Sequence, residues 1–358
     1  MCFYLSIFFI LLFVKFISKR GAFLGSVLLF FLFVISAFRG PTVGDDTINY
    51  FYNNLREVGF DTGSTDSYSF EITYQFLAAS IREVGLPSNT ILFFLSFITF
   101  FFIYLSAKKT RVRLTELCFF FYSTLLFFLS LNIARQMAAV AIVLYALTFL
   151  MDKNKRWNLL FFPFILFASS IHISSIVCLL FYLIKFVPAF NLWNRKVIIF
   201  CSFIILFVVV MVNRNRIIDT ILPYMTLWEL YNRDNMMGLR ASDTTLASFI
   251  VSFGRMIINV YILLWLNKTK QKEVQHIFFL AIVSSIVFTV LIGNLLRMQY
   301  YVQIIYLIVY SWFFSYERIL KSPSTRVVFL IFIFISFIQL YACLRTDTYQ
   351  LIPYKFFF

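Results

Sequence analysis

The first residues that could do chemistry form a polar stretch between apolar runs, from Arg39 to Tyr50. Its two carboxylates, Asp45 and Asp46, are adjacent, so one can face a cavity while the other caps the next helix. Glycine and proline residues in the stretch end the preceding helix and let the backbone bend. Arg39 would then lie at the edge of a membrane, where a guanidinium can hold an anion.

Three arginines fall at membrane depth, beside or inside apolar runs: Arg135, Arg255 and Arg297, the last followed closely by Tyr300. A charge at such depth costs several kcal/mol unless it faces a partner or a wet cavity, so intramembrane charge points to function. The alternative is pairing that only holds helices together. The acidic partners for such pairing would be Asp45, Asp46 and Asp243.

His172 lies at a turn between two short apolar runs, in the serine-rich segment from Ala168 to Ser175. An imidazole can act as a base near neutral pH. The alternative is a histidine that is merely hydrogen-bonded among serines.

Composition indicates an all-α, polytopic integral membrane protein. Of its 358 residues, 61% are hydrophobic and 13% are charged, and mean hydropathy is +0.88. Lipid forces backbone groups to bond within their own segment, which favours helices. We expect one transmembrane domain over residues 1–358, with a retained first helix and about twelve spans. The apolar runs are 3–17, 22–38, 89–107, 114–131, 134–151, 157–170, 173–187, 196–212, 245–266, 276–292, 298–315 and 325–343.

Lysine and arginine in alternate short loops set the orientation. Basic clusters such as Lys108 to Arg113 and Lys268 to Lys272 mark the cytoplasmic side. The formal net charge of +15 falls on that side, so it reflects topology and gives no reason to expect a nucleic-acid partner. Cations on the outer side are almost all arginine, which suits forked recognition of phosphate or carboxylate.

Two longer loops are expected on the outer side, residues 39–88 and 213–244. In the first, the segment from Tyr74 to Glu83 is predicted to form a helix lying on the membrane surface. In the second, aromatic residues alternate with arginines and acids around Arg233. Such a mixture suits a sugar, and it equally suits an interfacial aromatic belt.

Three motifs together resemble a known family. The stretch from Arg39 to Tyr50 resembles the "R…G-x-D-T-x-x-Y" motif of the EpsG/Wzy-type polysaccharide polymerases. Asn132-x-x-Arg135-Gln136-x-x-Ala139 resembles their "N-x-x-R-Q-x-x-A" motif, and the segment around His172 resembles their "H-x-S" turn. The chain departs from the pattern at Asp45, where a small residue is expected, and Asp46 aligns with the motif.

The resemblance implies a GT-C-like fold and a metal-independent membrane glycosyltransferase without a cofactor. It would be an O-antigen polymerase in the bacterial inner membrane, with its active site on the periplasmic side. Its partners would be undecaprenyl-pyrophosphate-linked repeat units, membrane lipids and a chain-length regulator. Expected catalytic residues are Asp46, His172 and Arg135, with either Asp46 or His172 as the base. Expected pyrophosphate or sugar contacts are Arg39, Asp45, Tyr50, Arg233, Arg255, Arg297 and Tyr300.

Other classes of protein stay open at this point. A lipid-linked oligosaccharide flippase also binds pyrophosphate with arginine, but its cations should be accessible from both sides. An O-antigen ligase uses outer arginines and a histidine, with one dominant loop. A metal-dependent glycosyltransferase would place Mg²⁺ or Mn²⁺ on Asp45 and Asp46. An acetyltransferase and a purely structural membrane protein are further alternatives.

Overall fold

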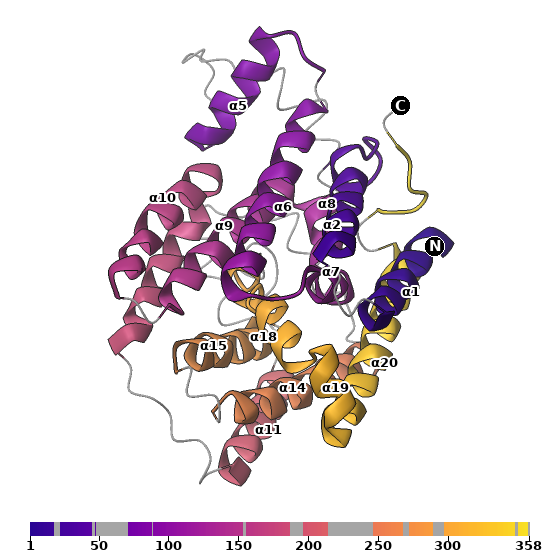
Figure 1. Cartoon of the computed structure of the whole chain (residues 1–358), viewed down its shortest axis with the longest axis vertical. Helices are drawn as coiled ribbons and strands as arrows, with labels where there is room; N and C mark the ends of the chain where they lie inside the picture. The colour runs from indigo at the N-terminus through magenta and orange to yellow at the C-terminus, as the bar shows by residue number, and fades with distance from the viewer. Residues whose placement is uncertain are drawn as a thin grey trace. The chain divides into compact units, whose positions relative to one another are not determined.

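The computed structural model describes eleven stretches of the chain, and all structural statements below concern these stretches. They are residues 1–17, 22–44, 47, 71–87, 89–152, 155–186, 196–213, 246–267, 272–288, 297–347 and 350–356. These residues form helices and no strand, as the all-α prediction requires (Figure 1). They belong to two compact units, Met1–Tyr182 with Tyr306–Phe358 (unit 1) and Leu183–Ile305 (unit 2).

Unit 1 is built around three consecutive helices that are apolar on every face. They are α7 (Leu114–Ser123), α8 (Leu126–Asn132) and α9 (Ala134–Leu150), and their side chains are almost all buried. A helix that is hydrophobic all round belongs in an interior. The surrounding helices are α1 (Cys2–Ile17), α2 (Ala22–Ala37), α5 (Ile72–Glu83), α6 (Thr90–Thr110), η1 (Lys155–Leu160), α10 (Phe161–Ile171), α18 (Tyr306–Phe313), α19 (Tyr316–Lys321) and α20 (Pro323–Thr346).

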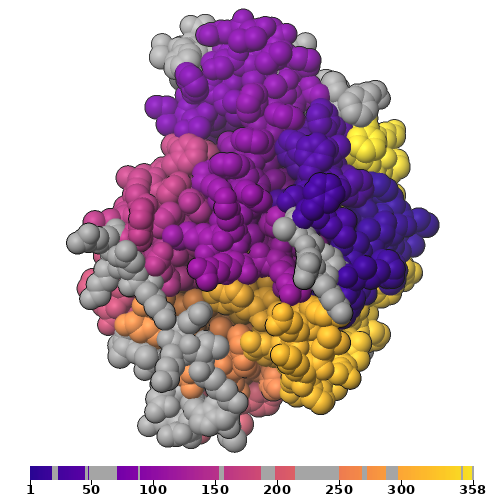
Figure 2. Space-filling model, viewed as in Figure 1, coloured from indigo at the N-terminus to yellow at the C-terminus, as the bar shows by residue number. Residues whose placement is uncertain are grey.

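The surrounding helices bury one side and expose apolar side chains on the other. Helices α2 and α6 pack together, and α6 and α10 pack on α9. Figure 2 shows the indigo surface of α1 and α2 beside the purple surface of α6. Phe13, Phe23 and Phe30 on α1 and α2 are largely exposed. Phenylalanine on an outer surface is what contact with lipid chains requires, because lipid is the solvent of a membrane protein.

Unit 2 contains α11 (Lys196–Val212), α14 (Leu246–Leu266), α15 (Lys272–Phe288) and α17 (Tyr300–Gln303). Helix α15 packs against α11, α14 and α17. The Nε2 of Gln303 donates to Ser285 Oγ and to Gln299 Oε1, both at 2.8 Å, which fastens α17 to α15. The 3₁₀-helix η2 (Ile173–Phe186) runs across the boundary between the two units.

The helices are shorter and more broken than the predicted spans. Among the described residues, α6 and α20 are long and apolar enough to cross a membrane, and α7 with α8 makes a third if the bent pair is one span. The expected run 114–131 is bent by 68° because Leu125, between α7 and α8, adopts a left-handed conformation (φ 63°). The expected run 298–315 is divided into α17 and α18. The count of about twelve spans, the single transmembrane domain and the GT-C-like architecture stay predictions.

The expected run 173–187 forms a 3₁₀-helix, which is longer than an α-helix of the same number of residues. Its 14 residues extend about 28 Å at the 3₁₀ rise of about 2.0 Å per residue. The same residues as an α-helix would extend only about 21 Å. A run that is too short for an α-helical span therefore approaches the thickness of a bilayer core, about 30 Å.

Two groups of contacts in unit 1 join segments that are distant in the chain. At one end, Tyr122 donates from its hydroxyl to Tyr4 O (2.7 Å), and Tyr4 donates to Leu351 O (3.1 Å). The backbone N–H of Gly40 donates to Lys355 O there (2.7 Å). This end thus joins the start of α1, the loop after α2 and the C-terminal segment. Which end faces the cytoplasm stays a prediction.

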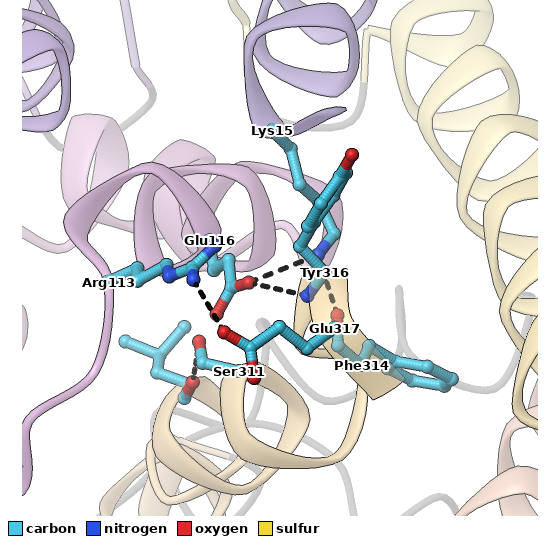
Figure 3. A network of polar contacts seen from close by, with 8 residues as sticks. Lys15, Arg113, Glu116, Ser311, Phe314, Tyr316 and Glu317 are labelled. Atoms are coloured by element: carbon cyan, nitrogen blue, oxygen red, sulfur yellow. Dashed lines mark hydrogen bonds and ion pairs between the residues drawn. The ribbon is translucent and has the colours of Figure 1, made fainter. Parts of the chain in front are cut away.

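The other end of unit 1 holds a buried ion pair between α1 and α7 (Figure 3). Lys15 Nζ lies 3.9 Å from Glu116 Oε1 and donates to Phe314 O at 2.7 Å. Glu116 Oε1 also accepts from the backbone N–H of Tyr316 (2.9 Å). Both charged side chains are almost fully buried, at 0% and 3% exposed. The pair therefore links α1, α7 and the connection between α18 and α19.

The substitution Glu116→Gln is expected to lower the free energy of unfolding by about 3 kcal/mol, because buried Lys15 loses its counter-charge. The amide still accepts the Tyr316 N–H, so the loss isolates the charge. Glu317→Gln is the matched control, since Glu317 contacts Arg113 at 3.4 Å but is 70% exposed. That change should cost less than about 1 kcal/mol. Unfolding in detergent measures both, and equal losses would contradict the role of the buried pair.

Candidate functional site

The structure brings Arg135 and His172 together on one carboxylate, that of Glu71. Arg135 Nη1 lies 3.1 Å from Glu71 Oε2, and His172 Nδ1 lies 3.0 Å from Glu71 Oε1. The backbone N–H of Ile173 donates to Oε1 as well (3.0 Å). Three donors thus converge on two oxygens, and two residues predicted from separate motifs share one site.

Each of the three side chains lies where a helix begins or ends. Glu71 is extended (φ −64°, ψ 148°) and immediately precedes α5. Ile133 has a non-helical backbone (φ −97°, ψ 58°) and separates α8 from α9. Arg135 therefore lies in the first turn of α9. His172 is extended (φ −151°, ψ 109°) and separates α10 from η2. Side chains at helix ends can turn toward one another without interrupting a helical face.

Helix α5 holds Glu71 against the rest of unit 1. The Tyr74 ring lies under the Arg135 guanidinium, with 4.7 Å from Cζ to the ring centroid, and Thr73 Oγ1 donates to Ser170 Oγ on α10 (2.7 Å). The predicted helix from Tyr74 to Glu83 is present as α5, and its position on a membrane surface stays a prediction. The site is partly open, because the side chains of Arg135, His172 and Glu71 are 21%, 26% and 14% exposed.

Glu71 is ionised over the physiological range. Burial raises the pKa of its carboxyl, but hydrogen bonds from His172 and backbone N–H groups, together with the charge of Arg135, outweigh burial and lower the pKa to about 2. Hydrogen bonds to the charged form favour that form. At neutral pH the carboxylate is therefore an acceptor of hydrogen bonds only.

The lowered pKa of Glu71 predicts a loss of stability in acid. The ionised carboxyl contributes its full stabilisation above its ordinary pKa of 4.5, and the contribution is lost as pH falls toward about 2. The difference in free energy of unfolding between wild type and Glu71→Gln should therefore shrink across this window. Unfolding in detergent at a series of pH values measures it, and a difference that grows toward low pH would contradict the assignment.

The loop after α2 is fastened to the end of α8 through Arg39 and Thr47. Arg39 is fully buried, donating from Nη1 to Ser36 O and from Nε to Thr47 Oγ1 (3.2 Å). Thr47 in turn donates to Leu131 O (3.1 Å), one residue before the "N-x-x-R-Q" motif. The first two predicted motifs therefore meet at Leu131. In these contacts Arg39 binds the protein itself, and its contact with substrate stays a prediction.

Gly44 has a left-handed backbone (φ 95°), and a Cβ there would lie 2.2 Å from Leu131 O. Gly44→Ala should therefore combine backbone strain of about 1–2 kcal/mol with displacement of the loop. Gly85→Ala is the control, because Gly85 also has a positive φ (72°) but open space around it. We expect the Gly44 variant to be the less stable by more than about 1 kcal/mol and to lose activity. Equal stabilities would show that the loop does not need this close approach.

The remaining predicted site residues are distributed as follows. Asp45, Asp46, Tyr50 and Arg233 lie outside the described residues. Arg255, in α14, and Arg297 and Tyr300, at α17, belong to unit 2, whereas Arg135 and His172 belong to unit 1. Within the described stretches, no three His, Cys, Asp or Glu side chains are grouped to hold a metal ion.

The sequence interpretation missed Glu71 and Tyr74 as members of the site. Glu71 is far from both partners in the chain, and no spacing connects it to them. The available signal was local: an acidic residue directly before the predicted surface helix, in the loop that follows the "R…G-x-D-T" motif. A carboxylate at a helix start usually indicates favourable interaction with the helix dipole, so this signal alone would not have distinguished a site.

Comparison with known proteins gives one match. A family model described as the EpsG family matches residues 22–356, nearly the whole chain, including all three motifs and Glu71. The comparisons with curated proteins and with solved structures found no match.

Proposed function

The chain belongs to the EpsG family, and from this premise we propose that it is a membrane glycosyltransferase that polymerises a polysaccharide. It would transfer a growing glycan from undecaprenyl pyrophosphate to the non-reducing end of another lipid-linked repeat unit. The reaction would take place at the periplasmic face of the bacterial inner membrane. An O-antigen is the product that the motif resemblance favours.

One observation carries this proposal: Arg135 and His172, from two separate motifs, are held by the same carboxylate at one end of unit 1. A fixed cation beside an imidazole supplies the two things that glycosyl transfer from a diphosphate needs. The leaving group requires stabilisation of developing negative charge, and the attacking hydroxyl requires a base.

The chemistry follows from these two roles. The acceptor hydroxyl attacks the anomeric carbon opposite the pyrophosphate, inverts that carbon and expels the pyrophosphate with the electron pair of the broken C–O bond. Arg135 stabilises the departing charge, since a planar guanidinium can contact a carboxylate on one edge and a phosphate on another. Either Asp46 or His172 takes the proton. No metal enters this scheme.

We assign pyrophosphate or sugar binding to Arg39, Asp45, Tyr50, Arg233, Arg255, Arg297 and Tyr300. The lipid tail would enter between helices from the outer leaflet, and a chain-length regulator would be a protein partner.

Arg135→Ala is expected to abolish chain extension without reducing the amount of protein, because the developing pyrophosphate charge loses its fixed cation. Arg82→Ala is the matched control, since Arg82 is exposed in the last turn of α5. The glycan ladder of a deletion strain complemented with each variant measures the outcome. Polymer of wild-type length in the Arg135 variant would refute the role of that residue.

The deletion strain itself separates the classes of protein. Loss of a polymerase leaves only single-repeat glycans. Loss of a flippase removes repeat units from the outer face, and loss of a ligase leaves polymer on its lipid carrier. Either of the last two outcomes would overturn the proposed function.

A further inference from the structure

The imidazole of His172 is oriented by the Glu71 carboxylate. Glu71 Oε1 lies 3.0 Å from Nδ1, and as an ionised group it can only accept, so Nδ1 carries the hydrogen. When the ring is neutral, its lone pair is then on Nε2. The described residues provide no hydrogen-bond partner for Nε2, and the side chain is 26% exposed. A substrate hydroxyl could therefore approach this atom.

Glu71 is itself held in place. Its other oxygen contacts Arg135, the N–H of Ile173 fixes Oε1, and α5 is fastened to α10 by the hydrogen bond from Thr73 to Ser170. Tyr74, one turn further along α5, lies under the Arg135 guanidinium. The carboxylate therefore sets both the direction of the imidazole and its distance from the cation.

We propose that Glu71 is a positioning residue that makes His172, rather than Asp46, the general base of the transfer. This inference rests on the proposed function and narrows it. In the step, the acceptor O–H proton moves to His172 Nε2 while the oxygen bonds to the anomeric carbon. The C–O bond to pyrophosphate breaks, and its electron pair leaves with the pyrophosphate. The carboxylate stabilises the imidazolium that forms.

The charged and titratable groups around His172 are few in the described part of the chain. Glu71 contacts the ring from the start of α5, and Arg135 on α9 and Tyr74 on α5 lie behind Glu71. The neighbours on α10 and η2 are neutral: Ser169, Ser170, Ile173, Ser174 and Ser175. Glu71 is therefore the charged group in direct contact with the imidazole in the described part of the chain.

Glu71→Gln tests the inference by removing this charge. The glutamine amide has one acceptor oxygen, whereas the carboxylate accepts three donors on two oxygens. The neutral amide also no longer stabilises the imidazolium. We expect the initial rate of polymerisation at pH 7.5 to fall about 10²-fold, the lower range for general-base catalysis. We also expect the acid limb of the rate profile, its low-pH side, to move, because the imidazolium formed in the step loses its anionic partner.

Right-side-out membrane vesicles from the complemented deletion strain provide the assay, since their external pH is the pH at the outer face. They carry the endogenous lipid-linked repeat units, and chain growth is followed between pH 5 and pH 9. Glu71→Asp keeps the anion and should keep the acid limb of the wild type at a reduced rate. Glu83→Gln removes the exposed carboxylate at the end of α5 and should match wild type in both respects.

The outcomes separate the two proposals. No chain growth in wild-type vesicles would contradict the proposed function itself. Growth in wild type with an unmoved acid limb in Glu71→Gln, or a wild-type rate in His172→Ala, would overturn the positioning role alone. The position of the limb does not depend on the amount of protein, so a poorly accumulating variant still gives the answer. Absence of folded protein for both the Gln and Asp variants would assign Glu71 to the fold and overturn the inference.

Discussion

The carboxylate of Glu71 is the constraint on which the site depends, because it fixes a guanidinium and an imidazole that otherwise belong to different helices. Arg135 lies in the first turn of α9, and His172 directly follows the last residue of α10. The described structure joins these two side chains through one carboxylate, which precedes a third helix. Ionised Glu71 also offsets one positive charge there, so the arginine can be retained in a partly apolar setting.

The scaffold explains why this meeting point is stable. Helices α7 to α9 form a buried centre, and the interruptions at Leu125 and Ile133 let one continuous segment of chain turn twice inside it. The loop after α2 is fastened to the same segment at Leu131 by Thr47, and Gly44 permits the close approach. Backbone carbonyls released by an interrupted helix need partners in an apolar interior, and this loop supplies one.

Two residues of the candidate site could be singled out from the sequence because charge is rare in such a chain. An arginine between apolar runs and one of two histidines stand out, and both Arg135 and His172 were identified this way. Glu71 was not, because acidic residues are common in the long loop 39–88 and only the fold selects one of them. Helix positions followed from apolar runs, whereas the break at Leu125 did not, since leucine carries no signal for a left-handed backbone. The 3₁₀ form of η2 could not be predicted either, because the pattern of apolar residues over 173–187 is compatible with an α-helix and with a 3₁₀-helix.

Two of the ion pairs in the described part of unit 1 differ in exposure, and the difference indicates which of their charges a substrate could reach. At one end, Glu116 and Lys15 are sealed, and their remaining contacts are backbone groups and aromatic rings. At the other, Glu71 and Arg135 stay partly exposed, and a second titratable side chain shares the carboxylate. A sealed pair can only hold helices together, because exchanging either partner would bury a bare charge. An exposed pair can exchange one contact for a phosphate while its other contacts persist. Exposure to solvent, rather than the presence of charge, therefore decides which cation can bind a substrate.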